Sequence, residues 1–381
     1  MGLENEKSLE TKSTMKKHKY TTIHYESYLG LDKILGAQNL RSADLQEDPA
    51  HDEMLFIITH QAYELWFKQA IHELSSIVNM FDKKQVNERS LGIAVARLAR
   101  VGKIFKLLLE QIPIMESMTP LEFLDFRKYL FPASGFQSFQ FRKIENLMGL
   151  ETAQRMTYAG HHYADFFTKK QQAELKAIED GKSLFEAVET WLERTPFLQL
   201  GKWNFLKKYR GAVEQMVEKE AAAIKASDYL SKKDKKMRLK MMGNTDTYFK
   251  SILDKEVHQT LVNEGKQRLS YNATLAALFI SLYNEEPILQ LPYRFLISLM
   301  DVDGLLTEWR YRHAQMVLRM LGRKVGTGGS SGHKYLNATA VKHPIFNDLH
   351  NISTLLIPKS ELPPLSDAVK RGLGFWYEAQ E

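Results

Sequence analysis

The chain has 381 residues, of which 44% are hydrophobic and 26% are charged, as in ordinary globular proteins and unlike disordered chains. It contains no cysteine, which excludes disulfides, cysteine-ligated haem, iron–sulfur clusters and thiol catalysis. The net charge of +6 permits an acidic partner. Much of the excess lies in the run 232–240, which is typical of a solvated helix face, so we expect no nucleic-acid partner.

The first twenty residues are polar and lack the apolar segment of a signal peptide. The longest apolar stretch, around 275–283, is too short to span a bilayer. We therefore expect a cytoplasmic protein with no membrane association, whose residues 1–19 form a flexible arm.

Helical periodicity begins after this arm and continues through most of the chain. Asp48 and Pro49 predict a helix start, and the apolar spacing that follows carries this helix to about residue 80. Pro113 and Pro120 are expected to break the chain. Further helices are predicted at 89–111, 121–130, 136–149, 164–193, 202–252 with an interruption near 243–244, 270–284 and 293–321.

Sustained alternation with period two is almost absent, so the sequence predicts an all-α protein. We expect residues 20–381 to form one multi-helix domain. The charged stretch at about 205–252 is expected to be a peripheral helical insertion on it.

Two histidines lie on apolar helix faces. Trp309 and Met316 share a face with His313, and Phe56 precedes His60 by one turn. A lone imidazole in such a setting suits a haem ligand or a site beside an aromatic wall. A hydrogen-bonded core histidine fits the same pattern, and on the pattern alone it is the more common case.

Two other segments could bind a ligand. Glycines in 326–332 let backbone amides approach a ligand closely, although a flexible linker would have the same composition. Phe123 and Arg127 lie one helical turn apart, so a ring and a guanidinium can face one pocket. Arginine binds carboxylates through two hydrogen bonds, but a surface ion pair with Glu122 or Asp125 would explain Arg127 equally well.

Taken together, these segments resemble the tryptophan 2,3-dioxygenase family, in the family's order, from about residue 25 to about residue 358. The matching segments are 25–35 (YESYLGLDKIL), 56–68 (FIITHQAYELWFK), 125–127 (DFR), 132–138 (PASGFQS), 309–311 (WRY) and 326–332 (GTGGSSG). The segment around His60 and the glycine-rich segment are highly specific. The charged stretch and the tails carry no family motif.

The resemblance implies a helical homotetramer, a dimer of dimers, with one haem b per subunit. It implies that O₂ is inserted across the indole C2–C3 bond of L-tryptophan to give N-formyl-L-kynurenine. That reaction is the first step of tryptophan catabolism by the kynurenine pathway.

The resemblance also assigns roles to single residues. His313 falls on the axial haem ligand, with Trp309 and Ser134 beside the haem, and His60 falls on the catalytic distal histidine. Phe56 and Phe123 fall on the apolar wall, and Arg127 falls on the residue that binds the substrate carboxylate. Thr327 falls on the residue that contacts the ammonium and carboxylate ends of the substrate. Tyr25 and Tyr28 fall on residues that a neighbouring subunit supplies. Some family members carry tyrosine where this chain has Phe123, so one hydroxyl contact is missing here.

Three rival functions remain open on the sequence alone. Another haem oxygenase or a peroxidase-like enzyme could use the same axial histidine, and a gas sensor could bind haem without catalysis. A sensor needs no clamp for an amino acid, so Arg127 and Thr327 discriminate against it. A basic helical nucleic-acid-binding protein would show binding that depends steeply on salt.

Overall fold

The computed structural model describes residues 22–45, 48–156, 162–196, 198–200, 202–322, 324 and 332–374, apart from the side chains of 244–247. These residues form helices joined by short loops, with one two-stranded antiparallel ribbon that pairs Gln199 with Asn204 and Leu200 with Trp203. The chain is therefore all-α, as the sequence predicts. The predicted arm, 1–19, lies outside the described residues.

The elements of the first half of the chain are α1 (Tyr25–Leu29), α2 (Leu31–Leu35), α3 (Glu53–Phe81), α4 (Glu88–Met115), α5 (Pro120–Leu130), η1 (Gly135–Gln137), α6 (Phe139–Met148), η2 (Thr152–Gln154), η3 (Tyr163–Phe166), α7 (Lys169–Glu179) and α8 (Leu184–Glu193). Those of the second half are β1 (Gln199–Leu200), β2 (Trp203–Asn204), α9 (Phe205–Ala226), α10 (Lys232–Leu253), α11 (Lys255–Asn263), α12 (Tyr271–Leu282), α13 (Pro287–Leu321), α14 (Gly332–Lys342), α15 (Asn347–Asn351), η4 (Ile352–Leu355), η5 (Lys359–Glu361) and α16 (Asp367–Leu373).

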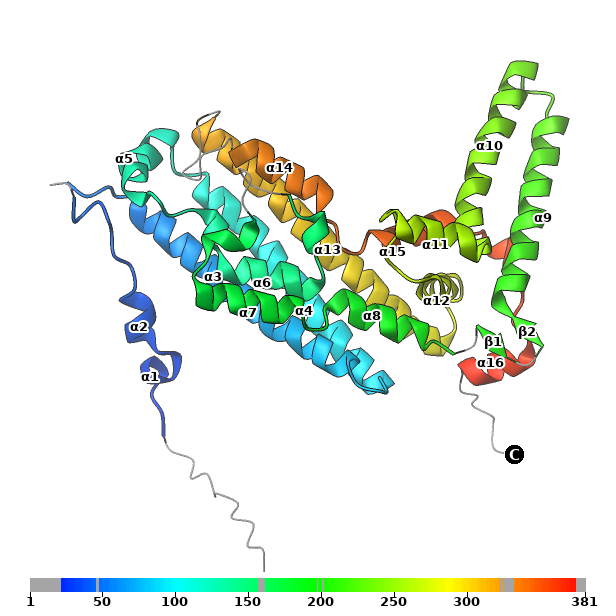
Figure 1. Ribbon diagram of the computed structural model, residues 1–381, viewed down its shortest axis with the longest axis horizontal. Coiled ribbons are helices and arrows are strands. Elements are labelled where there is room, and N and C mark those ends of the chain that lie inside the picture. The colour runs from blue at the N-terminus through cyan, green and yellow to red at the C-terminus, as the bar shows by residue number, and fades with distance from the viewer. Residues whose placement is uncertain are drawn as a thin grey trace, which may run out of the picture.

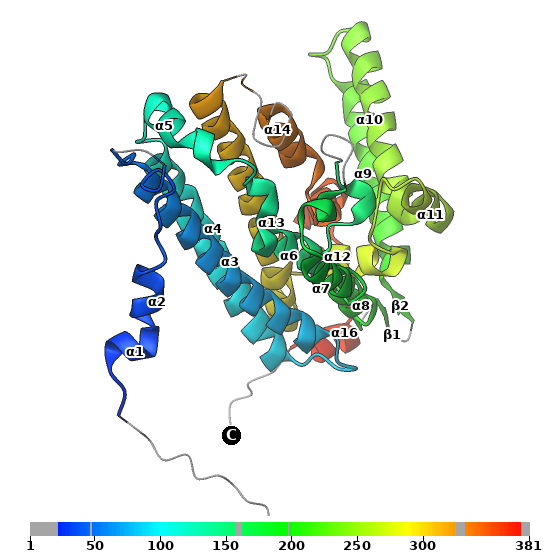
Figure 2. The same ribbon diagram turned by 60° about the vertical axis from the view of Figure 1, so that its left-hand side comes forward.

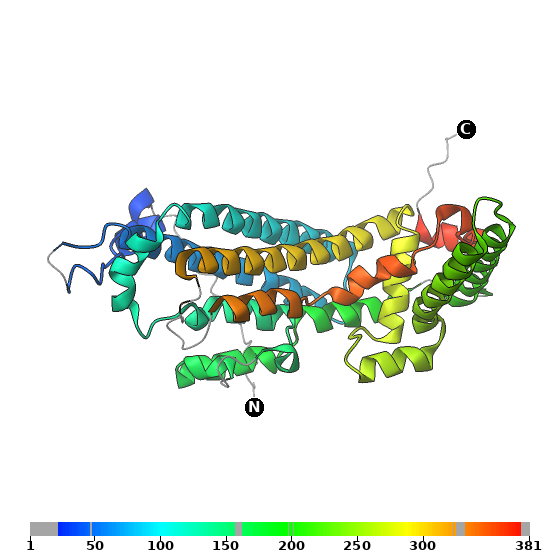
Figure 3. The ribbon, with the colours of Figure 1, turned by 90° about the horizontal axis from the view of Figure 1, so that it is seen from above.

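Three long helices, α3, α4 and α13, run side by side along the molecule and form its core (Figures 1 and 3). The α6 helix packs on α3, and α14 packs on α13. The α12 helix is apolar around most of its circumference and is buried from Ala273 to Ile280, as expected of a helix enclosed by others. No helix of the described chain is both long enough and apolar enough to cross a membrane.

Several predicted boundaries are wrong. The α3 helix begins at Glu53 and not at Asp48, because Glu53 is buried and its carboxylate accepts hydrogen bonds from the amides of Arg41 (2.8 Å) and Ser42 (2.9 Å). Pro113 does not end α4, which continues to Met115 because Ile112 and Met115 are buried in the core. Packing outweighs the cost of a proline inside a helix here.

Two predicted helices are divided differently from the expectation. The predicted helix 164–193 is interrupted, because Ser183 and Glu186 form a capping box that starts α8 afresh. The break in the charged stretch lies at 227–231, where the hydroxyl of Ser231 accepts a hydrogen bond from Asp234 N and begins α10. Gly243 lies inside α10.

The α9–α10 pair forms a hairpin that extends beyond the other helices (Figure 1). It carries most of the basic run, and Tyr229 at its turn is fully exposed. Our single-domain assignment with a peripheral insertion at 205–252 stays a prediction.

The Glu53 contact fixes the chain that enters α3, and we expect Glu53→Ala to lower the free energy of unfolding by about 3 kcal/mol. The reason is that the amides of Arg41 and Ser42 lose their carboxylate acceptor. Urea denaturation followed by circular dichroism measures the change. Glu88→Ala, at the exposed start of α4, is the control and should change stability by less than about 0.5 kcal/mol. Equal stability of the Glu53 variant and the wild type would contradict this assignment.

Candidate functional site

Helices α3, α5 and α13 supply most of the predicted site residues. His60 and Phe56 lie on α3, Phe123 and Arg127 on α5, and His313 on α13. The α5 helix lies at the end of the bundle where α3 begins and α13 ends (Figures 1 and 2). The fold therefore brings together residues that are far apart in the sequence.

The imidazole of His313 lies parallel to the indole of Trp309, with ring centroids 5.2 Å apart and planes at 7°. Trp309 is itself held between the rings of Phe141 (5.0 Å), Phe67 (5.8 Å) and Tyr63 (5.9 Å). This packing fixes the direction in which the side chain of His313 points.

Burial, and secondarily the neighbouring His60, lowers the pKa of His313 to about 4. The ring is therefore neutral at pH 7. No described residue forms a hydrogen bond with it. A neutral imidazole with an unengaged nitrogen is the form of histidine that binds metal ions.

The imidazole of His60 lies on α3 next to the ring of Phe56. Its Nδ1 is 2.7 Å from the carbonyl oxygen of Phe56, and its ring centroid is 4.1 Å from that of Phe56. Because a carbonyl only accepts hydrogen bonds, we assign the proton to Nδ1, which leaves Nε2 as an acceptor. Solvent reaches the ring, but burial by the surrounding protein lowers its pKa despite the opposing effect of the hydrogen bond to Phe56.

An aromatic wall, formed by Phe56, Phe123 and Phe126, stands beside His60. The ring centroids are separated by 5.7 Å (Phe56–Phe123), 5.5 Å (Phe56–Phe126) and 5.4 Å (Phe123–Phe126). Met316 and Met320, one and two turns beyond His313 on α13, belong to the same apolar cluster. The wall and the two histidines therefore border one region that suits a flat apolar ring.

The start of α5 is set by its sequence. Thr119 and Glu122 form a capping box, and Pro120 occupies the first helical position. This start places Phe123 and Arg127 one turn apart on α5. Arg127 is half-buried, as is Ser134, whose hydroxyl accepts a hydrogen bond from Phe136 N at 3.4 Å.

Three predicted residues are not brought to this site by the described chain. Thr327 lies outside the described residues. Tyr25 and Tyr28 lie on α1, which together with α2 extends away from the bundle (Figure 1), and their side chains are 76% and 71% exposed. Their predicted contact with another subunit stays a prediction.

Sequence analysis missed two residues of this region. Phe126 completes the aromatic wall and is fully buried, and its position three residues after Phe123 is the signal that could have identified it. Glu64, one turn after His60, accepts a hydrogen bond from the hydroxyl of Ser138 at 2.6 Å. Burial raises the pKa of Glu64, and this contact ties α3 to the loop that follows Ser134.

Within the described ranges, no group of three or more His, Asp or Glu side chains is arranged to hold a metal ion. A metal bound here would have His313 as its protein ligand and would need to bring further ligands of its own. The class of protein that this fold and site define is an all-α protein in which two neutral imidazoles border an aromatic wall.

Comparison with known proteins gives the family. The model of the family described as tryptophan 2,3-dioxygenase matches residues 9–356. Proteins named tryptophan 2,3-dioxygenase from Bdellovibrio bacteriovorus and Alteromonas mediterranea are each 46% identical, over 94% and 93% of this chain and over 100% and 98% of their own lengths. One of that name from Dictyostelium discoideum is 45% identical over 93% of this chain and 88% of its own.

The chain belongs to the tryptophan 2,3-dioxygenase family. It is therefore an enzyme of the oxidoreductase class, a dioxygenase. The resemblance drawn from the sequence is confirmed.

The assigned tautomer of His60 can be tested directly. We expect ring-nitrogen NMR of histidine-labelled protein to show His60 neutral at pH 7, protonated at Nδ1, with a titration midpoint below 6.5. The reason is that burial disfavours the imidazolium and that Phe56 O fixes the proton. The spectrum of His60→Gln assigns the resonance. A ring protonated at Nε2, or charged at pH 7, would refute the assignment.

Proposed function

We propose that this protein uses haem b bound at His313 to insert O₂ across the indole C2–C3 bond of L-tryptophan, giving N-formyl-L-kynurenine. The observation that carries the proposal is the neutral imidazole of His313, which has no hydrogen-bond partner among the described residues and lies beside an aromatic wall and a second neutral imidazole. The relatives that carry the name tryptophan 2,3-dioxygenase give the substrate.

The residues present fit haem. Because the described residues offer no cluster of metal ligands around His313, the site suits a metal that is already held by a porphyrin. Trp309, stacked on His313, would orient the ligand ring, and the Ser134 loop would lie beside the cofactor. When bound, haem supplies the O₂ binding and the oxidising chemistry.

The aromatic wall would receive the indole ring of tryptophan. Phe56 and Phe123 offer apolar surface, while Arg127 on the same helix as Phe123 would bind the carboxylate. Thr327 would contact the ammonium group. Binding at both ends fixes the ring relative to His60 and His313 and selects an amino acid with a large flat side chain.

His60 would accept a hydrogen bond from the indole N–H. Its Nδ1 proton is engaged with Phe56 O, so Nε2 faces the substrate as an acceptor. An indole N–H is a very weak acid, and attack on the ring does not require its removal. We therefore assign His60 a positioning contribution of about 0.5–1.5 kcal/mol and not the larger effect of a general base.

The proposed reaction balances without a reductant, because both oxygen atoms enter the product. One oxygen becomes the ketone at C3 and the other the formyl group at C2, as the C2–C3 bond breaks. The residues of this chain then need to bind, orient and shield the substrate, and no site for an electron donor is required. The reaction would begin the kynurenine pathway in the cytoplasm.

We propose further that the protein is a homotetramer in which a neighbouring copy completes the site. The arm formed by α1 and α2 exposes Tyr25, Tyr28 and Leu35. An apolar surface hollow of about 520 Å³ lies at the start of α3, lined by Leu40, Pro49, Ala50, His51, Met54, Leu55 and Ile58. The exposed apolar arm and this hollow are the kinds of surface that a second copy covers.

Replacing His313 by alanine tests the cofactor. We expect the variant to lose the Soret band and the turnover of tryptophan with O₂, because the protein bond to iron is removed. Absorption spectroscopy of purified protein and chromatographic detection of N-formyl-L-kynurenine measure the two effects. His350→Ala, an exposed histidine on α15, is the control and should keep both. A stoichiometric Soret band in the His313 variant would exclude His313 as the ligand.

Arg127→Met should lower kcat/KM for tryptophan by about 30-fold to several thousand-fold, since a carboxylate loses its charged partner, a loss of about 2–5 kcal/mol. The haem spectrum should stay unchanged. Lys128→Met, the next residue on α5 and exposed, is the matched control and should retain wild-type kinetics. Unchanged kcat/KM in the Arg127 variant would remove Arg127 from the proposed substrate site.

A further inference from the structure

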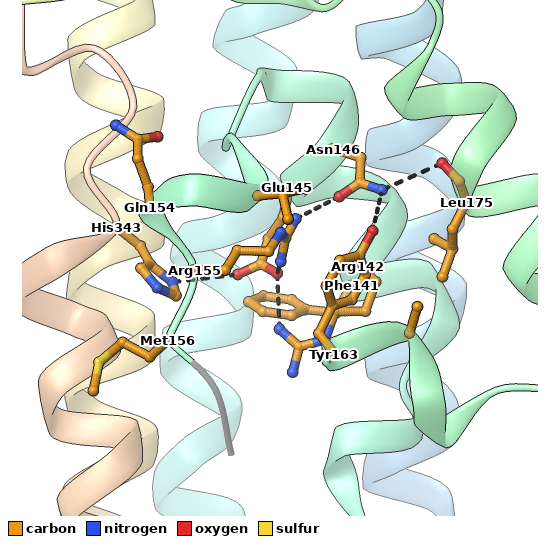
Figure 4. A network of polar contacts seen from close by, with 12 residues as sticks. Phe141, Arg142, Glu145, Asn146, Gln154, Arg155, Met156, Tyr163, Leu175 and His343 are labelled. Atoms are coloured by element: carbon orange, nitrogen blue, oxygen red, sulfur yellow. Dashed lines mark hydrogen bonds and ion pairs between the residues drawn. The ribbon is translucent and has the colours of Figure 1, made fainter. Parts of the chain in front are cut away.

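A buried ion cluster lies between α6, α13 and the loop after η2, outside the proposed active site (Figure 4). The carboxylate of Glu145 accepts hydrogen bonds from Arg142 (2.8 Å), Arg155 (2.7 Å) and Arg310 (2.8 Å). Arg142, Glu145 and Arg310 are at most 8% exposed, and the side chain of Arg155 is 4% exposed. The cluster therefore holds three guanidinium groups around one carboxylate.

The charges of the cluster do not cancel. Burial alone would raise the pKa of Glu145, but Arg142, Arg155 and Arg310 hold it well below its usual value, so Glu145 is ionised. His343, which is 1% exposed beside Glu145, is neutral because burial lowers its pKa to about 4. Three positive charges thus face one negative charge, and no other described carboxylate pairs with these arginines.

Two further described acids lie near the cluster, and neither forms an ion pair with these arginines. Asp303, buried on α13, lies close enough to Arg310 for their charges to interact, but its carboxylate accepts hydrogen bonds from the amides of Ile345 and Phe346. Glu179 accepts hydrogen bonds from the hydroxyls of Tyr163 and Thr152, and neither contact involves a guanidinium. Buried charges of one sign without counter-charge are costly, which is why buried ions in proteins are almost always paired.

The cluster also has unused hydrogen-bond donors. The Nε–H groups of Arg142, Arg155 and Arg310 are buried without a partner, as are both ring nitrogens of His343. The distance between His343 Nδ1 and Glu145 Oε1 is 3.9 Å, which is too long for a hydrogen bond. Buried polar groups without partners are rare in folded proteins, and such groups can bind an ion or ordered water.

A surface hollow of about 550 Å³ opens beside this cluster. Its described lining is Ala153, Gln154, Arg155, Met156 and Lys342. Arg155 belongs both to the lining and to the cluster, so the hollow lies next to the excess charge. Figure 4 shows Arg155 beside Glu145. The volume lies within the range of about 300–1,000 Å³ that is typical of small-molecule sites.

The polar side chains of the hollow are donors. Gln154 Oε1 already accepts a hydrogen bond from Glu151 N at 3.3 Å, which leaves its amide NH₂ for a ligand. Lys342 adds an exposed ammonium group, and no carboxylate is among the described lining residues. Guanidinium, ammonium and amide donors together are the groups that bind carboxylates and phosphates.

We infer that this hollow binds a small oxyanion, which pairs with Arg155 and Lys342 and compensates the excess positive charge around Glu145. The expected ligand is a free phosphate or a free carboxylate that enters from solvent. A carboxylate of the bound haem is the competing source of the same chemistry, because Arg310 lies one turn before His313 on α13. The inference does not depend on the proposed catalytic function.

Isothermal titration of the haem-loaded, full-length protein with inorganic phosphate, and separately with acetate, tests the inference. Sodium chloride keeps the ionic strength constant. We expect at least one probe to bind at one site per chain. Lys342→Met should weaken its Kd by about tenfold, equivalent to about 1.4 kcal/mol, while Lys342→Arg should restore it. Lys334→Met, an exposed lysine of α14 outside the described lining, is the matched control.

Three results would overturn the inference. One is saturable binding of neither probe to the wild type. Another is the same Kd in wild type, Lys342→Met and Lys334→Met, which would mean an adventitious ion only. The third is binding to the His313→Ala protein, expected to lack haem, but not to the haem-loaded protein, which would show that the haem carboxylates occupy the cluster.

Discussion

One buried carboxylate, Glu145, links the helix that carries His313 to α6 and to the loop after η2. It binds Arg142 on its own helix, Arg155 in the following loop and Arg310 on α13. Because these contacts are out of water, each is strong, and losing the carboxylate would leave three buried cations facing one another. The relative position of α6 and α13, and with it the packing of Phe141 against Trp309, therefore depends on the ionised state of Glu145.

Desolvation lowers the pKa of both site histidines, but in the proposed function the two rings have different tasks. Burial keeps His313 neutral, as a metal ligand must be, and keeps His60 neutral, as a hydrogen-bond acceptor must be. The two imidazole rings differ in the residue that each one contacts. Phe56 O fixes the proton of His60, whereas the stacked indole of Trp309 fixes the plane of His313 without using either nitrogen. In the proposed function, this difference directs the metal to α13 and the substrate N–H to α3.

The sequence predicted where most helices lie but not where several of them begin and end. It identified candidate site residues but not how they are arranged in space. Apolar spacing located α3 and α13 because burial on one face is a local property of the sequence. It failed at Pro113 and at Asp48, where tertiary contacts of Ile112 and Glu53 decide the boundary. That His60 lies near His313 follows from the packing of α3, α4 and α13, which no local pattern encodes. The family resemblance supplied that pairing. Phe126, Glu64 and the Glu145 cluster lay outside the motifs that carried the resemblance.

The described chain leaves one side of its site open, and the proposed assembly follows from this. The start of α3, which leads directly to Phe56, borders an apolar hollow on the outside of the aromatic wall. The same chain presents Tyr25, Tyr28 and Leu35 to solvent on helices that have no buried residue. Burying such side chains is favourable by about 25 cal/mol per Å² of apolar surface, so both features are stabilised when another copy covers them. A site that excludes water around an indole ring and O₂ needs this cover, which makes association of subunits a condition of the proposed catalysis.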